Sequence, residues 1–198
     1  WQLQHLQTDF AFEEVRVRWT DRLYRSGQPF EMFAGHRVGV NWDPIGFHAS
    51  EPGIGFEGLN LWGFRLNGLF AVLDDYNQTT DSHNIAGLQV QRRVGNWTLS
   101  ALYAGNARWA SEADQSGARY IIHPPKEFNT VYLVRFNGGV GFLPADVDGW
   151  AGVHALQTAG AAPQHVPAYE VNVNYALRED ITVKAGYKDY PAEFDPPY

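Results

Sequence analysis

The chain lacks cysteine and has a single methionine, Met32, among its 198 residues. The absence of cysteine excludes a disulfide framework, a thiolate metal site and a cysteine nucleophile. No apolar run approaches the roughly 20 residues that a transmembrane helix needs. The strands of a membrane β-barrel need only about 9–11 half-polar residues, so the sequence leaves that class open.

Positive charge is also scarce, with 15 Lys and Arg against 22 Asp and Glu, a formal net charge of −7. Binding to phosphate backbones needs a basic face, so we expect no nucleic-acid partner. Only 19% of the residues are charged, whereas 15% are aromatic and 20 are glycine. This composition indicates a turn-rich β protein rather than a disordered chain.

Apolar and polar residues alternate with a period of two in many segments. Val171 and Val173, for example, alternate with Asn172 and Asn174. Successive side chains of a strand point to opposite faces, so each such segment has one apolar and one polar face, as in antiparallel sheets. We predict an all-β fold, an antiparallel up-and-down meander of about ten strands over 10–20, 29–41, 54–66, 69–76, 85–93, 97–108, 128–137, 147–157, 168–177 and 181–190.

The connections between these strands alternate in length. Tight turns are predicted at Asn67-Gly68, Val94-Gly95-Asn96 and Arg178-Glu179-Asp180, and another is predicted to start at Asn137-Gly138-Gly139. Long connections follow at 42–53, 77–84, 109–127 and 158–167. Short turns at one end and long loops at the other are typical of a transmembrane β-barrel, so we treat 1–198 as one barrel domain or part of one.

The two faces of such a barrel are expected to meet different solvents. Trp and Tyr lie near predicted strand ends, where membrane barrels carry aromatic girdles. We expect lipid to contact Val15, Val17, Leu88, Val90, Val171, Val173, Ile181 and Val183. We expect the pore to be lined by Arg16, Arg18, Arg37, Gln89, Gln91, Asn172, Asn174 and Lys184. Cations in a narrow lumen attract anions, although an Arg opposite Glu13 or Glu31 is also ordinary cross-strand pairing.

Two short segments carry a resemblance to a known class. Phe30-Glu31-Met32-Phe33-Ala34-Gly35-His36-Arg37 precedes a loop and then Gly55-Phe56-Glu57-Gly58-Leu59-Asn60-Leu61. This layout, with the hairpins at 85–109 and 169–190, resembles bacterial porins and the alginate-export type of barrel. The resemblance implies passive diffusion of small polar or anionic solutes through the bacterial outer membrane, in contact with its lipid.

Strand number sets the width of such a pore. Ten strands at about 4.8 Å spacing, tilted by about 40°, close with a backbone radius of roughly 10 Å, which inward Arg and Gln side chains nearly fill. Both predicted chain ends also fall on the long-loop side. We therefore expect either a segment of a barrel of at least 12 strands or an open sheet that pairs with copies of itself.

Motifs for chemistry are weak. The histidines show no ligand pair at i,i+2 or i,i+4, and no Gly-x-Ser-x-Gly elbow occurs. We expect no catalysis, no cofactor and no metal. Two alternatives stay open: a soluble antiparallel barrel or sandwich that binds a glycan or lipid through its aromatics, and an outer-membrane enzyme with its site in the loops.

Overall fold

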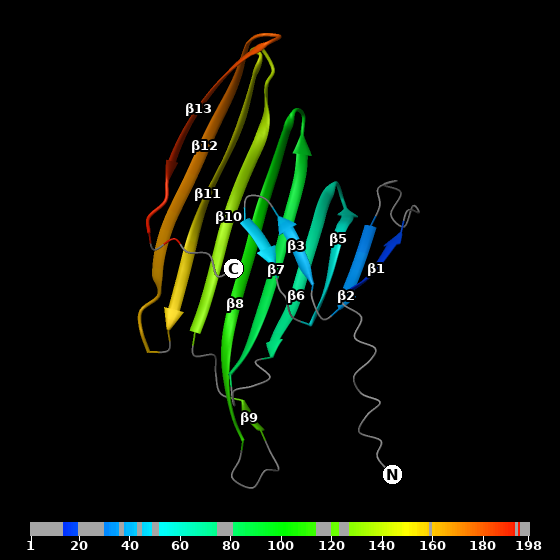
Figure 1. The fold of residues 1–198 in the computed structure, drawn as a ribbon, viewed down its shortest axis with the longest axis vertical. Coiled ribbons are helices and arrows are strands. Elements are labelled where there is room, and N and C mark those ends of the chain that lie inside the picture. Colours follow the sequence, from blue (N-terminus) through cyan, green and yellow to red (C-terminus); the bar gives the residue numbers. More distant parts are fainter. Residues whose placement is uncertain are drawn as a thin grey trace.

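A computed structural model describes residues 14–19, 30–35, 38–42, 45–48, 52–74, 81–113, 120–122, 127–158, 160–192 and 194. Within these residues the protein is all-β, and its main sheet is an antiparallel meander, as predicted (Figure 1). The ten strands of the meander, in spatial order, are β1 (Glu14–Trp19), β2 (Phe30–Gly35), β5 (Gly53–Leu61), β6 (Phe64–Asp74), β7 (Asp81–Val94), β8 (Trp97–Ala113), β10 (Glu127–Val140), β11 (Ala145–Thr158), β12 (Gln164–Arg178) and β13 (Ile181–Asp189). The described sheet is open, with β1 and β13 as its edges.

Three short strands lie outside this path. β3 (Gly39–Trp42) and β4 (Ile45–His48) form a separate hairpin inserted between β2 and β5. β9 (Tyr120–Ile122) pairs with the far end of β8. The predicted single strand over 29–41 is therefore wrong, because the chain leaves the main sheet after Gly35 and begins the inserted hairpin at Gly39.

The part of the chain that the structure describes holds no helix long and apolar enough to span a membrane.

Two predicted turns are confirmed and two are wrong. Gly95-Asn96 and Glu179-Asp180 each link two strands directly. Asn67 and Gly68 instead lie inside β6, opposite Gln89 and Leu88. The turn before β6 is Trp62-Gly63, and its φ values of 52° and 81° give the two left-handed residues that a tight hairpin requires.

The turn predicted to start at Asn137-Gly138-Gly139 also lies farther along the chain. These residues are part of β10, which continues to Val140. The connection to β11 covers residues 141–144 and includes a hydrogen bond from the Leu143 amide to the Val140 carbonyl at 2.8 Å. Two adjacent glycines are tolerated in this strand because a cross-strand Trp97 covers Gly138.

Strand direction places the connections at two ends of the sheet. The turns 62–63, 95–96, 141–144 and 179–180 share one end with the connection after β1 (Figure 1). The connections after β2, β6, β8 and β11 share the other end. The predicted alternation in length is thus present from β5 onward, whereas the connection between β1 and β2 is long although it lies at the short-turn end.

The registers extend the alternation across the whole sheet. Residues opposite one another in a register share a face. One face, the apolar face, carries the large exposed apolar side chains Val15, Val17, Met32, Ile54, Phe70, Leu88, Leu99, Tyr103, Phe128, Tyr132, Val134, Tyr169, Val171, Val173, Val183 and Tyr187. The opposite face, the polar face, carries most of the charged and amide side chains of the strands.

A hydrophobic core lies on part of the polar face. Phe33, Leu69, Ala71, Ile85, Leu102, Ala104, Val131 and Leu133 form one buried cluster with Val38, Val40 and Trp42 of the inserted hairpin segment. Gly53 makes this approach possible, because a Cβ there would lie 2.5 Å from Cγ2 of Val38. The inserted hairpin therefore covers an apolar area of the polar face, and Phe194 packs on a second one around Trp150.

Candidate functional site

Seven of the eight predicted pore-lining residues occupy the polar face. The registers bring Arg16, Arg18, Gln89, Gln91, Asn172, Asn174 and Lys184 to that one side of the sheet. Arg37 lies outside the described residues. The seven do not form one cluster, because Arg16 and Arg18 lie on β1 whereas Asn172, Asn174 and Lys184 lie on β12 and β13 at the other edge.

Polar residues on this face form rows of cross-strand partners near the short-turn end. One row runs through Arg65, Gln91, Ser100, Arg135, Trp150, Glu170 and Lys188. The next contains Arg93, Thr98, Asn137, Asp148 and Asn172, and a third contains Asp146, Asn174 and Lys184. The polar face is thus divided into an apolar area under the inserted hairpin and an open polar area beside it.

Gln89 belongs to the covered part of the face. It is only 3% exposed, and its Oε1 accepts a hydrogen bond from Nδ2 of Asn67 at 2.8 Å. The Asn67 Oδ1 in turn accepts the backbone N–H of Gly58 at 2.8 Å. Gly58 lies where the β5–β6 register shifts, so the Asn67 side chain supplies a partner that the irregular ladder does not. This arrangement makes Gln89 part of the folded framework.

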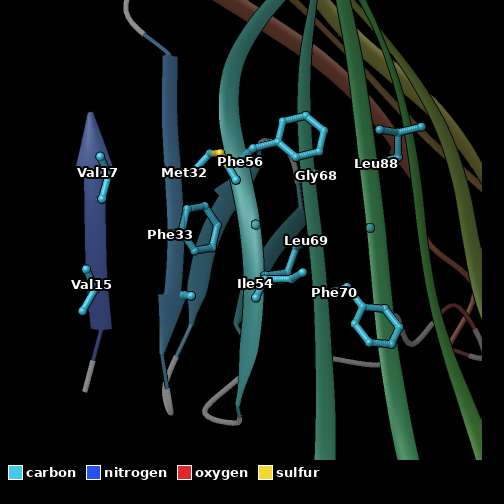
Figure 2. Close-up of a pocket in the computed structure, with 13 residues that line it drawn as sticks. Val15, Val17, Met32, Phe33, Ile54, Phe56, Gly68, Leu69, Phe70 and Leu88 are labelled. Atoms are coloured by element: carbon cyan, nitrogen blue, oxygen red, sulfur yellow. The ribbon is translucent and has the colours of Figure 1, made fainter. Parts of the chain in front are cut away.

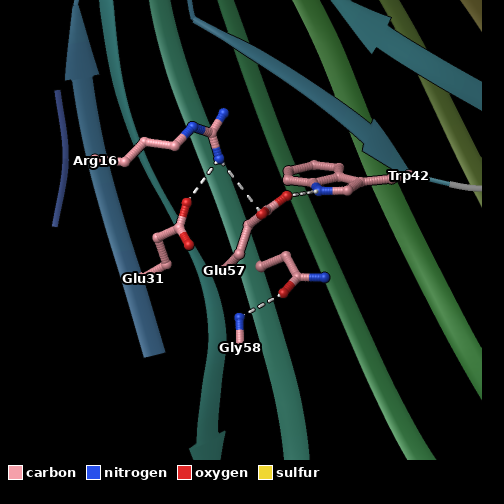
Figure 3. A network of polar contacts seen from close by, with 6 residues as sticks. Arg16, Glu31, Trp42, Glu57 and Gly58 are labelled. Carbon is pink, nitrogen blue, oxygen red and sulfur yellow. Dashed lines mark hydrogen bonds and ion pairs between the residues drawn. The ribbon is translucent and has the colours of Figure 1, made fainter. Parts of the chain in front are cut away.

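Arg16 forms an ion-pair network with two carboxylates (Figure 3). Its Nη1 lies 2.9 Å from Oε1 of Glu31 and 3.8 Å from Oε2 of Glu57. The other oxygen of Glu57 accepts a hydrogen bond from Nε1 of the buried Trp42 at 3.4 Å. One hydrogen-bonded carboxylate therefore links the inserted hairpin to β1 and β5, and the Arg16 charge is opposed by two acids.

A second ion pair lies in the polar rows. Arg135 donates from Nε to Oδ1 of Asp148 at 2.9 Å and from Nη2 to Oδ2 at 3.1 Å. Such a bidentate pair fixes the plane of the guanidinium as well as its charge. Beside it is a small polar pocket of 290 Å³ lined by Gln91, Thr98, Ser100, Arg135 and Asn137.

Most of these residues carry little signal in the sequence. Arg135 is in a segment where Val131, Leu133 and Val134 obscure the two-residue period. Asp148 and Ser100 are isolated short polar residues, and no spacing or motif connects them to Arg135 in the sequence. Only Gln91, from the predicted set, belongs to the polar pocket.

An aromatic cluster packs at the C-terminal end of the described chain. Trp150 contacts Tyr190 and Phe194, with ring centroids 5.2 and 5.9 Å apart. The Tyr190 hydroxyl donates to Glu170 at 3.3 Å, and His154 bonds to Asn129. Phe194 and Trp150 are only 7% and 5% exposed, so these two rings are packed, whereas Tyr190 is 47% exposed.

On the opposite side of the sheet, the apolar face has a broad depression of 490 Å³ across β1, β2, β5, β6 and β7 (Figure 2). Val15, Val17, Met32, Ile54 and Leu88 contribute to its lining, and every side chain in it is apolar. Water is a poor solvent for such a surface.

Among the described residues, no group of three His, Asp or Glu side chains is arranged to hold a metal ion. Comparison with protein-family models, with curated proteins and with solved structures finds no match. The porin resemblance therefore stays a prediction made from the residues.

Proposed function

We propose that this chain forms the wall of a β-barrel channel in the bacterial outer membrane, through which small polar solutes diffuse passively. The observation that carries the proposal is the apolar face. Large apolar side chains on nine of the ten strands of the meander, all except β11, lie on this face and stay exposed, for example Ile54 at 61%, Val134 at 57% and Tyr187 at 64%. An exposed apolar surface of this extent costs free energy in water and favours lipid contact.

Two further observations support this proposal. The opposite face carries charged and amide groups in rows, as the lumen of a membrane barrel does. The tips of two short turns hold Trp62 and Phe142, which are 93% and 85% exposed. Aromatic side chains at the ends of strands are favoured at the membrane–water interface.

Single-cysteine labelling tests the facing of the strands, and the absence of native cysteine makes it direct. Asn172→Cys and the adjacent Val173→Cys differ only in the face they occupy. In liposomes, a water-soluble maleimide is expected to label Cys at 172 rapidly and Cys at 173 slowly, and both equally in denaturant. Equal labelling in liposomes contradicts the proposal.

A second candidate function rests on the apolar depression. A soluble β protein could bind a lipid there, because the lining is apolar and has the volume of a small-ligand site. Extraction separates the two candidates. A membrane channel requires detergent and runs on gels with heat-modifiable mobility, whereas a monodisperse protein in buffer without detergent is expected for the lipid-binding alternative.

A further inference from the structure

We infer that the pocket beside Arg135 is a binding subsite for a small, uncharged, polyhydroxylated solute about the size of one sugar ring. The inference rests on the proposed function, in which the polar face contacts the solute. The pocket is formed by three neighbouring strands, β7, β8 and β10, through Gln91, Thr98, Ser100, Arg135 and Asn137. It lies in the polar rows directly beside the area that the inserted hairpin covers.

The charge of the pocket favours a neutral ligand. Arg135 is its only charged lining residue, and Asp148 meets the guanidinium with both carboxylate oxygens at 2.9 and 3.1 Å. The two charges cancel locally, so an anion entering the pocket gains little Coulomb energy and meets the Asp148 carboxylate. The pair also holds the guanidinium in one plane, which presents a fixed wall to the pocket.

The buried hydroxyl of Ser100 is a second, independent observation that points to a ligand in this pocket. Ser100 is 9% exposed, and its Oγ has no hydrogen-bond partner in the described part of the protein. Buried polar groups are almost always paired, and an unpaired one costs free energy. Ser100 stands directly between Gln91 and Arg135 in the registers, so a solute hydroxyl entering between these two side chains would reach it.

The other lining groups define the ligand class. The hydroxyl of Thr98 and the amides of Gln91 and Asn137 can each donate and accept hydrogen bonds. Sugar hydroxyls do the same without carrying charge, whereas phosphate brings a negative charge that the Arg135–Asp148 pair does not attract. The volume of 290 Å³ is at the lower limit of about 300 Å³ for drug-sized ligand pockets, so a single ring fits better than an oligosaccharide.

The test is a saturation-transfer NMR titration of the full chain in detergent micelles, with glucose as the probe and inorganic phosphate as its anionic counterpart. We expect glucose to bind to the wild type. Ser100→Ala and Thr98→Val should each weaken binding by about threefold to tenfold, the loss that corresponds to one hydrogen bond. Thr182→Val is the matched control, because Thr182 lies on the same face but in an exposed position on β13, outside the pocket.

Each outcome has one meaning. Glucose binding that Ser100→Ala weakens and Thr182→Val leaves unchanged supports the subsite. Phosphate binding that depends on Arg135 contradicts the proposed class of ligand. Glucose binding that neither pocket variant changes contradicts the proposed location of the subsite. The absence of glucose binding contradicts the subsite as well. Conductance in planar bilayers is measured in parallel: glucose binding without conductance contradicts the channel but keeps the subsite, and conductance without glucose binding does the reverse.

Discussion

Several glycines in this protein lie beneath aromatic rings of the neighbouring strand. Phe33 is opposite Gly55, Phe56 opposite Gly68, and Phe136 opposite Gly149. A Cβ at Gly68 would lie 2.7 Å from Cζ of Phe56, and one at Gly149 would lie 2.6 Å from Cζ of Phe136. The ring fills the space above the glycine, which shields the backbone and fixes the register.

This pairing gives a prediction about Gly68. Gly68→Ala is expected to destabilise the protein by about 1–3 kcal/mol, because the new methyl group displaces the Phe56 ring. In a Phe56→Ala background the same substitution should cost much less, since the obstructing ring is gone. The measurement is the free energy of unfolding in urea, in detergent micelles, for the four members of the double-mutant cycle.

The cycle also distinguishes the two explanations of Gly68. A turn residue with positive φ would suffer from a Cβ whether or not Phe56 is present. An undiminished cost in the Phe56→Ala background would therefore exclude the packing explanation. The Asn67-Gly68 dipeptide predicts a turn here, because Asn-Gly is the strongest short hairpin signal. This local signal contains no information about the hydrogen bonds that the buried Asn67 side chain makes with Gly58 and Gln89.

At the scale of elements, the tight turns depend on backbone conformation rather than on packing. Gly95 has a φ of 59°, and nothing lies within 4 Å of the position of its missing Cβ. Gly141, in the connection after β10, has equally open surroundings but no left-handed φ. The two glycines are thus a matched pair that differs in φ.

We expect Gly95→Val to destabilise the protein by about 1–2 kcal/mol, the cost of a left-handed conformation for an L-residue. Gly141→Val should change the free energy of unfolding by no more than about 0.5 kcal/mol, as for most surface substitutions. Urea unfolding of both variants, alongside the wild type, measures the difference. Equal effects of the two substitutions would mean that the β7–β8 turn does not depend on its positive φ.

The inserted hairpin shows what two-residue periodicity leaves undetermined. Val38 and Val40 alternate as they would in any half-buried strand, so the sequence predicts one strand over 29–41, with Trp42 at the start of the long connection over 42–53. Alternation identifies a strand and its apolar side but not the surface that this side packs against. In the structure these three residues are almost fully buried against the polar face of the main sheet. That choice follows from long-range packing, which no local pattern contains.

At the scale of the whole molecule, the meander and its two faces could be predicted from alternation and turn composition alone. Short connections imply antiparallel neighbours. In a regular register, residues opposite one another share a face, so a few segments with clear alternation, such as 171–174, determine which residues of the neighbouring strands lie on each face. The polar pocket could not be predicted in this way. It depends on Gln91, Ser100 and Arg135 lying side by side on three strands, of which β10 has weak alternation.

The edges of the sheet add a condition to the proposed function. All nine residues of β13 are exposed, and β1 and β13 are not paired with each other in the described chain. In lipid, every backbone N–H and C=O needs a partner, so an edge strand cannot stay open. A membrane role therefore requires β13 and β1 to pair with one another, with further strands or with copies of this chain.

The structure changes the expected ion preference of the proposed channel more than any other expectation from the sequence. Arg16 and Arg18 alone would favour anions, but Arg16 is balanced by Glu31 at 2.9 Å and Glu57 at 3.8 Å. Arg16→Gln is therefore expected to remove the cation that balances these two carboxylates and to shift the reversal potential in a salt gradient towards cation preference. The matched control is Arg92→Gln, which removes the same charge from the apolar face, where Arg92 lies over the Phe64 ring. Planar-bilayer recordings of both variants measure the effect. If Arg92→Gln shifted the ion preference as much as Arg16→Gln, the polar face would not be the surface that the ions pass.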